Sequence, residues 1–260
     1  MVQFAANLTM LFTEVPFLDR FERAAAAGFR AVEMLFPYDH PAEAVAERLQ
    51  RFGLTLALFN MPPGDWAAGD RGMAAIPGRA DEFRANLETA RRYARTLGCT
   101  RLHAMAGITR GLDPAACGET FVANLRHAAD LLAGDGVTVL VEPLNDRDMP
   151  GYFLAHQEDA LRLVEAVDRP NVAVQLDLYH AQIMDGDLTR RIERMAGRFA
   201  HVQIASVPDR HEPDAGEVNY PHLFETLDRV GYRGWIGCEY RPRAGTEAGL
   251  SWFAPYRATR

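Results

Sequence analysis

Cysteine is scarce in this chain of 260 residues, which contains only Cys99, Cys117 and Cys238. The number is odd and the spacing fits no metal-binding pattern, so we expect buried thiols rather than a disulfide framework or a zinc site. This usage is typical of a reducing compartment. The sequence therefore predicts a cytoplasmic protein.

Long apolar runs and an excess of positive charge are missing as well. No stretch approaches the roughly 20 apolar residues of a membrane span, and residues 1–10 lack the basic start and the cleavage pattern of an export signal. The formal net charge of −7 argues against an extended phosphate-binding surface. We expect neither a membrane nor a nucleic acid as partner, and the sequence leaves the oligomeric state open.

A glycine-rich dinucleotide fingerprint is also absent, which disfavours a doubly wound sheet. Short apolar strands instead alternate with amphipathic helical stretches along the whole chain. We expect strands at 4–8, 31–35, 54–59, 101–106, 137–141, 172–176, 201–205 and 235–238, and helices at 15–27, 41–52, 81–97, 113–132, 156–167, 187–196 and 220–230. Eight strands with helical crossovers in about 250 residues predict an α/β fold, a closed (β/α)₈ TIM barrel forming a single domain over residues 1–260.

The stretch 172–180 places polar groups directly after an apolar strand. Residues 172–176 suit a parallel strand covered on both faces, where an unpaired carboxylate is costly. Asp177 therefore either meets a metal or a substrate, or merely caps the following turn while His180 packs in the core. This strand alone does not decide between the two interpretations.

Polar residues also end the other predicted strands. Because the active site of a TIM barrel lies at the carboxyl ends of its strands, these side chains should converge: Asn60, His103, Glu142, Asp177, Gln203 and Glu239. Four of them, Glu142, Asp177, Gln203 and Glu239, supply three carboxylates and one amide oxygen, a hard ligand set suited to Mg²⁺ or Mn²⁺. A single strand-end carboxylate is better explained by a rim ion pair with Arg101, Arg147 or Arg241, whereas three together favour a site.

Several separated motifs carry a family resemblance. They are EPLN at 142–145, PGY at 150–152, DLYH at 177–180, HVQIA at 201–205, RHEP at 210–213, GEVNYP at 216–221 and GWIGCEY at 234–240. Their order and spread over nearly the whole chain resemble the hydroxypyruvate isomerase family, which includes 2-oxotetronate isomerases and belongs to the xylose-isomerase-like TIM barrels.

The resemblance implies a divalent cation, Mg²⁺ or Mn²⁺, held by Glu142, Asp177, Gln203 and Glu239. It also implies that Glu142 and Glu239 are the proton donor and acceptor, without saying which removes the proton. The reaction would convert hydroxypyruvate to tartronate semialdehyde, or interconvert 2-oxo- and 3-oxotetronates. Related ketose 3-epimerases usually have histidine where this chain has Gln203, which favours the isomerase branch.

The residue types suit this chemistry. A proton that moves between adjacent carbons beside a carbonyl passes through an enediolate, whose negative charge a cation stabilises. A carboxylate within hydrogen-bond reach carries the proton, and cation binding should keep the two glutamates ionised.

Arg210 is the predicted partner of the substrate carboxylate. It follows strand 201–205 closely, and a guanidinium can hold a carboxylate through two parallel hydrogen bonds. The alternative is that Arg210 pairs with Asp209, Glu212 or Asp214 in an acidic surface loop.

Five further residues are weaker candidates for substrate binding. His180 either contacts substrate or supports the site from the core, and Asp148 either binds a substrate hydroxyl or lies in a solvated turn. Asn60 and Arg71 belong to the longest loop, which we expect to close over the substrate and exclude water. His103 either reaches the substrate or only packs.

Three other functions remain open at this point. A ketose 3-epimerase would use the same barrel on a neutral sugar. A phosphodiesterase resembling the apurinic endonucleases would need a cluster of metal-binding histidines and a basic face, and the sequence shows neither. A non-catalytic barrel that binds sugar acids would bind ligand without exchanging substrate protons with solvent.

Overall fold

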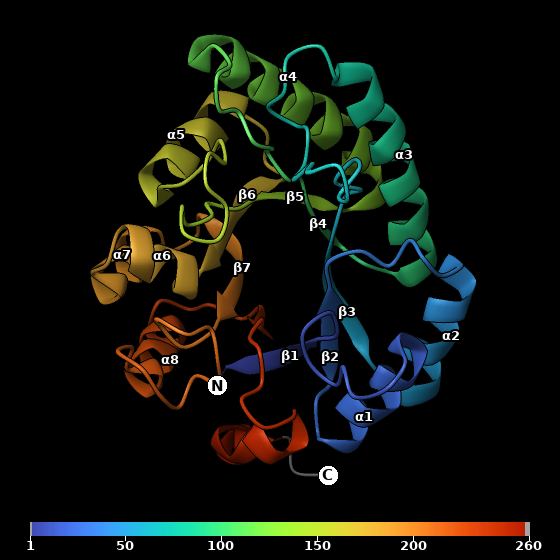
Figure 1. Cartoon of the computed structure of the whole chain (residues 1–260), viewed down its shortest axis with the longest axis vertical. Helices are drawn as coiled ribbons and strands as arrows, with labels where there is room; N and C mark the ends of the chain where they lie inside the picture. Colours follow the sequence, from blue (N-terminus) through green and yellow to red (C-terminus); the bar gives the residue numbers. More distant parts are fainter. Residues whose placement is uncertain (1, 258–260) are drawn as a thin grey trace.

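Eight parallel strands close into a barrel in the computed structural model, which describes residues 2–257 (Figure 1). Each strand pairs with the next along the chain, and β1 pairs with β8 to complete the ring. The strands are β1 Gln3–Asn7, β2 Ala31–Met34, β3 Thr55–Asn60, β4 Arg101–His103, β5 Thr138–Val141, β6 Val172–Asp177, β7 Phe199–Ile204 and β8 Trp235–Cys238. The predicted TIM barrel is confirmed.

The helices form the outer layer around this ring (Figure 1). They are α1 Arg20–Ala26, α2 Ala42–Phe52, α3 Ala80–Leu97, α4 Pro114–Leu132, α5 Gln157–Val167, α6 Leu178–Met184, α7 Leu188–Arg194 and α8 Tyr220–Arg229, with short 3₁₀ segments η1 Phe17–Asp19, η2 Ala133–Asp135 and η3 Glu247–Tyr256. All seven predicted helices are present, although the first begins later than expected, as η1 and then α1.

Besides the short η2, which extends α4, two helical segments were not expected from the sequence. Helix α6 begins directly after β6, because the Asp177 side chain accepts a hydrogen bond from the backbone N–H of Tyr179 and so caps the helix. Asp177 therefore both caps a helix and ends a strand, and His180 lies on α6. Segment η3 follows β8 in the place of an eighth crossover helix.

The interior of the barrel is polar near its catalytic end. Along β7, Val202 and Ile204 pack in the main apolar core, while the alternating His201 and Gln203 form hydrogen bonds with Glu33 inside the ring. TIM-barrel interiors are usually filled by branched apolar side chains. Buried polar groups of this kind need partners, and here they find them in one another.

The three cysteines are buried and free, as predicted. Within residues 2–257, no helix is both long enough and apolar enough to span a membrane.

Candidate active site

A cavity of about 250 Å³ opens among side chains that follow the strand ends. Its lining includes five of the six polar strand-end residues, namely Asn60, His103, Glu142, Gln203 and Glu239. The sixth, Asp177, is buried beside it. The convergence expected from barrel topology is therefore present.

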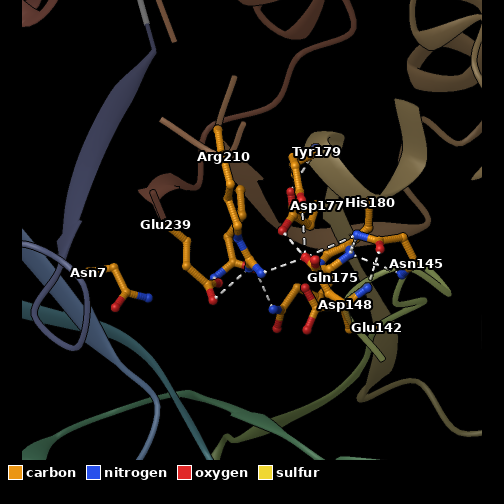
Figure 2. Close-up of polar contacts among 12 residues, drawn as sticks. Asn7, Glu142, Asn145, Asp148, Gln175, Asp177, Tyr179, His180, Arg210 and Glu239 are labelled. Carbon is orange, nitrogen blue, oxygen red and sulfur yellow. Dashed lines mark hydrogen bonds and ion pairs between the residues drawn. The ribbon is translucent and has the colours of Figure 1, made fainter. Parts of the chain in front are cut away.

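Carboxylates at the ends of β5, β6 and β8 lie around this cavity (Figure 2). Glu142, Asp177 and His180 each place one potential ligand atom within 4.8 Å of the others. Glu239 approaches from β8 and accepts a hydrogen bond from the Gln203 amide at 2.5 Å. The arrangement concentrates negative charge on largely buried side chains.

Burial shifts the protonation of these carboxyl groups. It raises the pKa of Asp177 to about 6 and that of Glu239 to about 8, while the positive charge of Arg210 acts in the opposite direction on both. Burial also raises the pKa of Glu142 well above its ordinary range, with a further contribution from the charges of Glu239 and Asp177. A divalent cation would favour the ionised forms, since its charge opposes both effects.

The residues present fit such a cation. Three carboxylates and one amide oxygen are hard ligands, and among the described residues the buried Oε1 of Glu142 has no hydrogen-bond partner. Gln203 currently directs its amide oxygen to Gln175 Nε2 at 2.6 Å, while its nitrogen faces Glu33 and Glu239. As a ligand, Gln203 would exchange the Gln175 contact for the cation.

His180 is held as a neutral ring. Its Nδ1 accepts the backbone N–H of Asn145 at 3.0 Å, which leaves the proton on Nε2, 3.5 Å from Asp177 Oδ2. Burial lowers the pKa of His180 well below its ordinary value. His180 therefore presents an N–H donor at the edge of the carboxylate cluster.

His103 is also neutral, because burial lowers its pKa to about 3. Its Nδ1 lies 3.4 Å from Glu142 Oε2, and it lines the cavity. The structure thus brings His103 to the site and gives it a carboxylate neighbour rather than purely apolar packing.

Arg210 extends from the loop after β7 into the site (Figure 2). It donates to Asp148 and to Glu239, each at 3.1 Å, and its guanidinium lies 4.8 Å from the ring centre of Tyr179. The surface-loop alternative is wrong: Glu212 and Asp214 pair instead with Arg243. Arg210 adopts a positive φ of 56°, a rare conformation for a residue with a side chain.

The remaining predicted substrate residues divide between the cavity and its rim. Asp148 lines the cavity and accepts a hydrogen bond from the Tyr179 hydroxyl at 3.0 Å. Asn60 lines it as well. Arg71 is absent from the cavity lining within the described chain, and its guanidinium instead lies 3.9 Å from the ring centre of Trp66, which does line the cavity.

Sequence reasoning missed a set of polar residues at the cavity, three of which, Asn7, Glu33 and Gln175, line it. They are Asn7, Glu33, Gln175 and His201, which join one another and Gln203 by hydrogen bonds. One signal was available, because Glu33 is the single acidic residue within the predicted strands. Trp66 gave no comparable signal, since it lies in an irregular loop.

The family described as the xylose isomerase-like TIM barrel matches residues 21–256. The chain belongs to this family. It is 56% identical over 257 residues to a 2-oxo-tetronate isomerase of Cupriavidus necator, covering 98% of this chain and 99% of the relative. It is 46% identical over 258 residues to a hydroxypyruvate isomerase of Escherichia coli, covering 99% and 100%. The family resemblance seen in the motifs is confirmed, and the chain is an enzyme of the aldose–ketose isomerase type.

A crystal structure from Brucella melitensis, described as an AP endonuclease of family 2, superimposes with a TM-score of 0.99. It is 67% identical in sequence, and the match covers 99% of this chain and 100% of that one. The fold is therefore shared closely with a solved structure.

Proposed function

We propose that the protein is a divalent-cation-dependent isomerase of small hydroxy-oxo acids that transfers a proton between adjacent substrate carbons. The observation that carries this proposal is that Glu142 and Glu239 line one cavity with Arg210, which pairs with Glu239, while Asp177 lies next to Glu142. The names of the C. necator and E. coli relatives support the same reaction class.

In this proposal, separate residues bind the cation and the substrate carboxylate. Glu142, Asp177, Gln203 and Glu239 hold the cation, which supplies electrostatic stabilisation of negative charge that develops on the substrate oxygens. Arg210 holds the substrate carboxylate through paired hydrogen bonds, fixing the neighbouring carbons relative to the glutamates.

Proton transfer falls to Glu142 and Glu239, which approach the cavity from β5 and β8. One removes the proton from a substrate carbon and the other returns a proton to its neighbour. In this proposal the Nε2–H of His180 donates to a substrate oxygen and the carboxylate of Asp148 accepts from a substrate hydroxyl. Their position at the cavity, which Asn60 and His103 also line, supports these roles. Arg71 acts indirectly, by holding Trp66 at the cavity.

The preferred substrate pair we propose is 2-oxotetronate and 3-oxotetronate, with hydroxypyruvate as the shorter alternative. The relative with the higher identity is named for the tetronate. Purified protein with Mg²⁺ or Mn²⁺ should convert both acids, with the higher kcat/KM for the four-carbon acid. A neutral ketotetrose of equal length, as a test for epimerase activity, should react much more slowly because Arg210 has no carboxylate to bind.

A second candidate function is phosphodiester cleavage, favoured by the description of the B. melitensis structure. The potential ligand cluster found among residues 2–257 contains a single histidine, His180, and the formal charge is −7. These features disfavour a polyanionic substrate. Incubation with DNA containing abasic sites decides the matter, and metal-dependent strand cleavage at a rate proportional to enzyme would replace the isomerase proposal.

A further inference from the structure

Glu33 lies on β2, lines the cavity and is fully buried. Its Oε1 accepts hydrogen bonds from Asn7 Nδ2 at 3.0 Å and from Gln203 Nε2 at 2.8 Å. Its Oε2 lies 2.6 Å from His201 Nε2. Oε1 therefore accepts from two amide groups, and an ionised Glu33 selects the His201 tautomer that carries its proton on Nε2, so that Oε2 also faces a donor.

The barrel leaves space for this carboxylate at Gly237 on β8. A Cβ atom at position 237 would overlap both carboxylate oxygens of Glu33. Glycine at this point of the strand therefore permits the close approach of a side chain from β2, which is separated from β8 only by β1. The position of the Glu33 carboxylate in the barrel interior is therefore fixed by its hydrogen bonds and by the space at Gly237.

The contact with Gln203 determines how the Gln203 amide is turned. A carboxylate that faces only donors acts as an acceptor, so it selects the amide nitrogen of Gln203 and not the oxygen. The same nitrogen also donates to Glu239. The amide oxygen is thereby directed towards β6, where it meets Gln175 and where Asp177 also lies.

We infer that Glu33 is a positioning residue for the cation site: it holds the nitrogen of Gln203 and so presents the Gln203 oxygen, and with it the Glu239 carboxylate, to the ion. This inference rests on the proposed function, because it assigns a purpose to Gln203 as a ligand. Residues that orient metal ligands typically change metal affinity by about 10- to 100-fold when they are replaced.

The competing interpretation is that Glu33, Asn7 and His201 only fill the barrel interior. In that case replacing Glu33 lowers the unfolding temperature without changing cation affinity in the protein that remains folded. Removal of Gln203 separates the two interpretations, since a residue that acts through Gln203 has little further effect once Gln203 is absent.

The experiment measures Mn²⁺ binding by titration calorimetry in wild type, Glu33→Gln, Gln203→Ala and the double variant, with thermal unfolding of each. Glutamine at position 33 retains the size but can accept through only one atom, so the amide of Gln203 loses its fixed orientation. We expect Glu33→Gln to weaken Mn²⁺ binding at least about tenfold and to add less than about twofold in the Gln203→Ala background.

Asn124→Ala is the structural control, because the buried Asn124 side chain donates to the Ala74 carbonyl, away from the barrel interior. It should lower the unfolding temperature and leave Mn²⁺ affinity unchanged. If Glu33→Gln does not fold, Glu33→Asp replaces it, since aspartate keeps the charge but withdraws the carboxylate from Gln203; the same loss of affinity is expected.

A folded position-33 variant with wild-type Mn²⁺ affinity overturns the inference, as do losses from Glu33→Gln and Gln203→Ala that multiply in the double variant. Wild-type protein that binds no Mn²⁺ is a different result. It overturns the proposed cation site itself, and the positioning role falls with it.

Discussion

Replacing Arg210 with lysine tests how the enzyme recognises a carboxylate. In the structure, Nη1 and Nη2 of Arg210 reach two separate carboxylates, Asp148 and Glu239, each at 3.1 Å. The same two nitrogens can donate parallel hydrogen bonds to one substrate carboxylate, whereas a lysine ammonium keeps the charge but cannot make this paired contact. The variant therefore removes geometry rather than charge.

The expected size of the effect follows from the hydrogen bond that lysine cannot make. A hydrogen bond to a charged group contributes about 1.5–3 kcal/mol, and lysine forfeits one of two. Since about 1.4 kcal/mol corresponds to a factor of ten, kcat/KM for 2-oxotetronate should fall about 10- to 100-fold. A neutral ketotetrose has no carboxylate to accept that bond, so its kcat/KM should change by less than about threefold.

Steady-state kinetics on both substrates at saturating Mn²⁺ provide the assay. Arg243→Lys is the matched control, because Arg243 pairs with Glu212 and Asp214 and does not line the cavity within the described residues. Its kinetics should remain near those of wild type. An Arg210→Lys enzyme with an unchanged Michaelis constant for the acid would refute the assignment and move the carboxylate site to another cavity residue, such as His103.

Three further predictions concern the carboxylates. Glu142→Gln and Glu239→Gln should each lower kcat at least about 100-fold while circular dichroism stays native, and near-wild-type turnover in one of them would exclude that residue from proton transfer. Asp177→Ala should weaken Mn²⁺ binding in calorimetry without unfolding the barrel, so wild-type affinity would contradict its role as a ligand. Without cation, the pKa values of Asp177 and Glu239 in the folded protein are about 6 and about 8, above their ordinary values near 4. The protonated forms of these two groups therefore stabilise the fold fully below about pH 4, and this stabilisation is lost as the pH rises through 8. Between about pH 5 and about pH 8, the unfolding temperature of metal-free wild type should therefore fall by more than the unfolding temperature of metal-free Glu239→Gln. Mn²⁺ should raise the unfolding temperature of wild type more at about pH 8 than at about pH 5. Equal pH dependence in wild type and Glu239→Gln would contradict the raised pKa of Glu239.

The barrel and its catalytic rim were predictable because both depend on regular features of the sequence. Apolar strands at even spacing define the ring, and parallel topology brings every strand end to one face. Glu142, Gln203 and Glu239 follow this rule directly. No contact between distant residues had to be known in advance.

The rest depended on contacts between residues that are distant in the sequence. Whether Arg210 paired within its own loop or across the cavity was decided by the position of Asp148, 62 residues earlier. The role of Glu33 depends on His201 and Gln203, 168 and 170 residues later. Helix α6 was missed because Asp177, interpreted as the end of a strand, also caps a helix.

The most direct test of the proposed reaction follows substrate protons by NMR in deuterated water. The protein is stripped of metal with a chelator, supplied with 2-oxotetronate, and then given Mg²⁺, which does not broaden the spectra. We predict formation of 3-oxotetronate, with deuterium incorporated from solvent, only after Mg²⁺ is added, and neither in Glu142→Gln nor in Glu239→Gln. Full turnover in rigorously metal-free protein, or saturable binding without any isomerisation or exchange, would contradict the proposal.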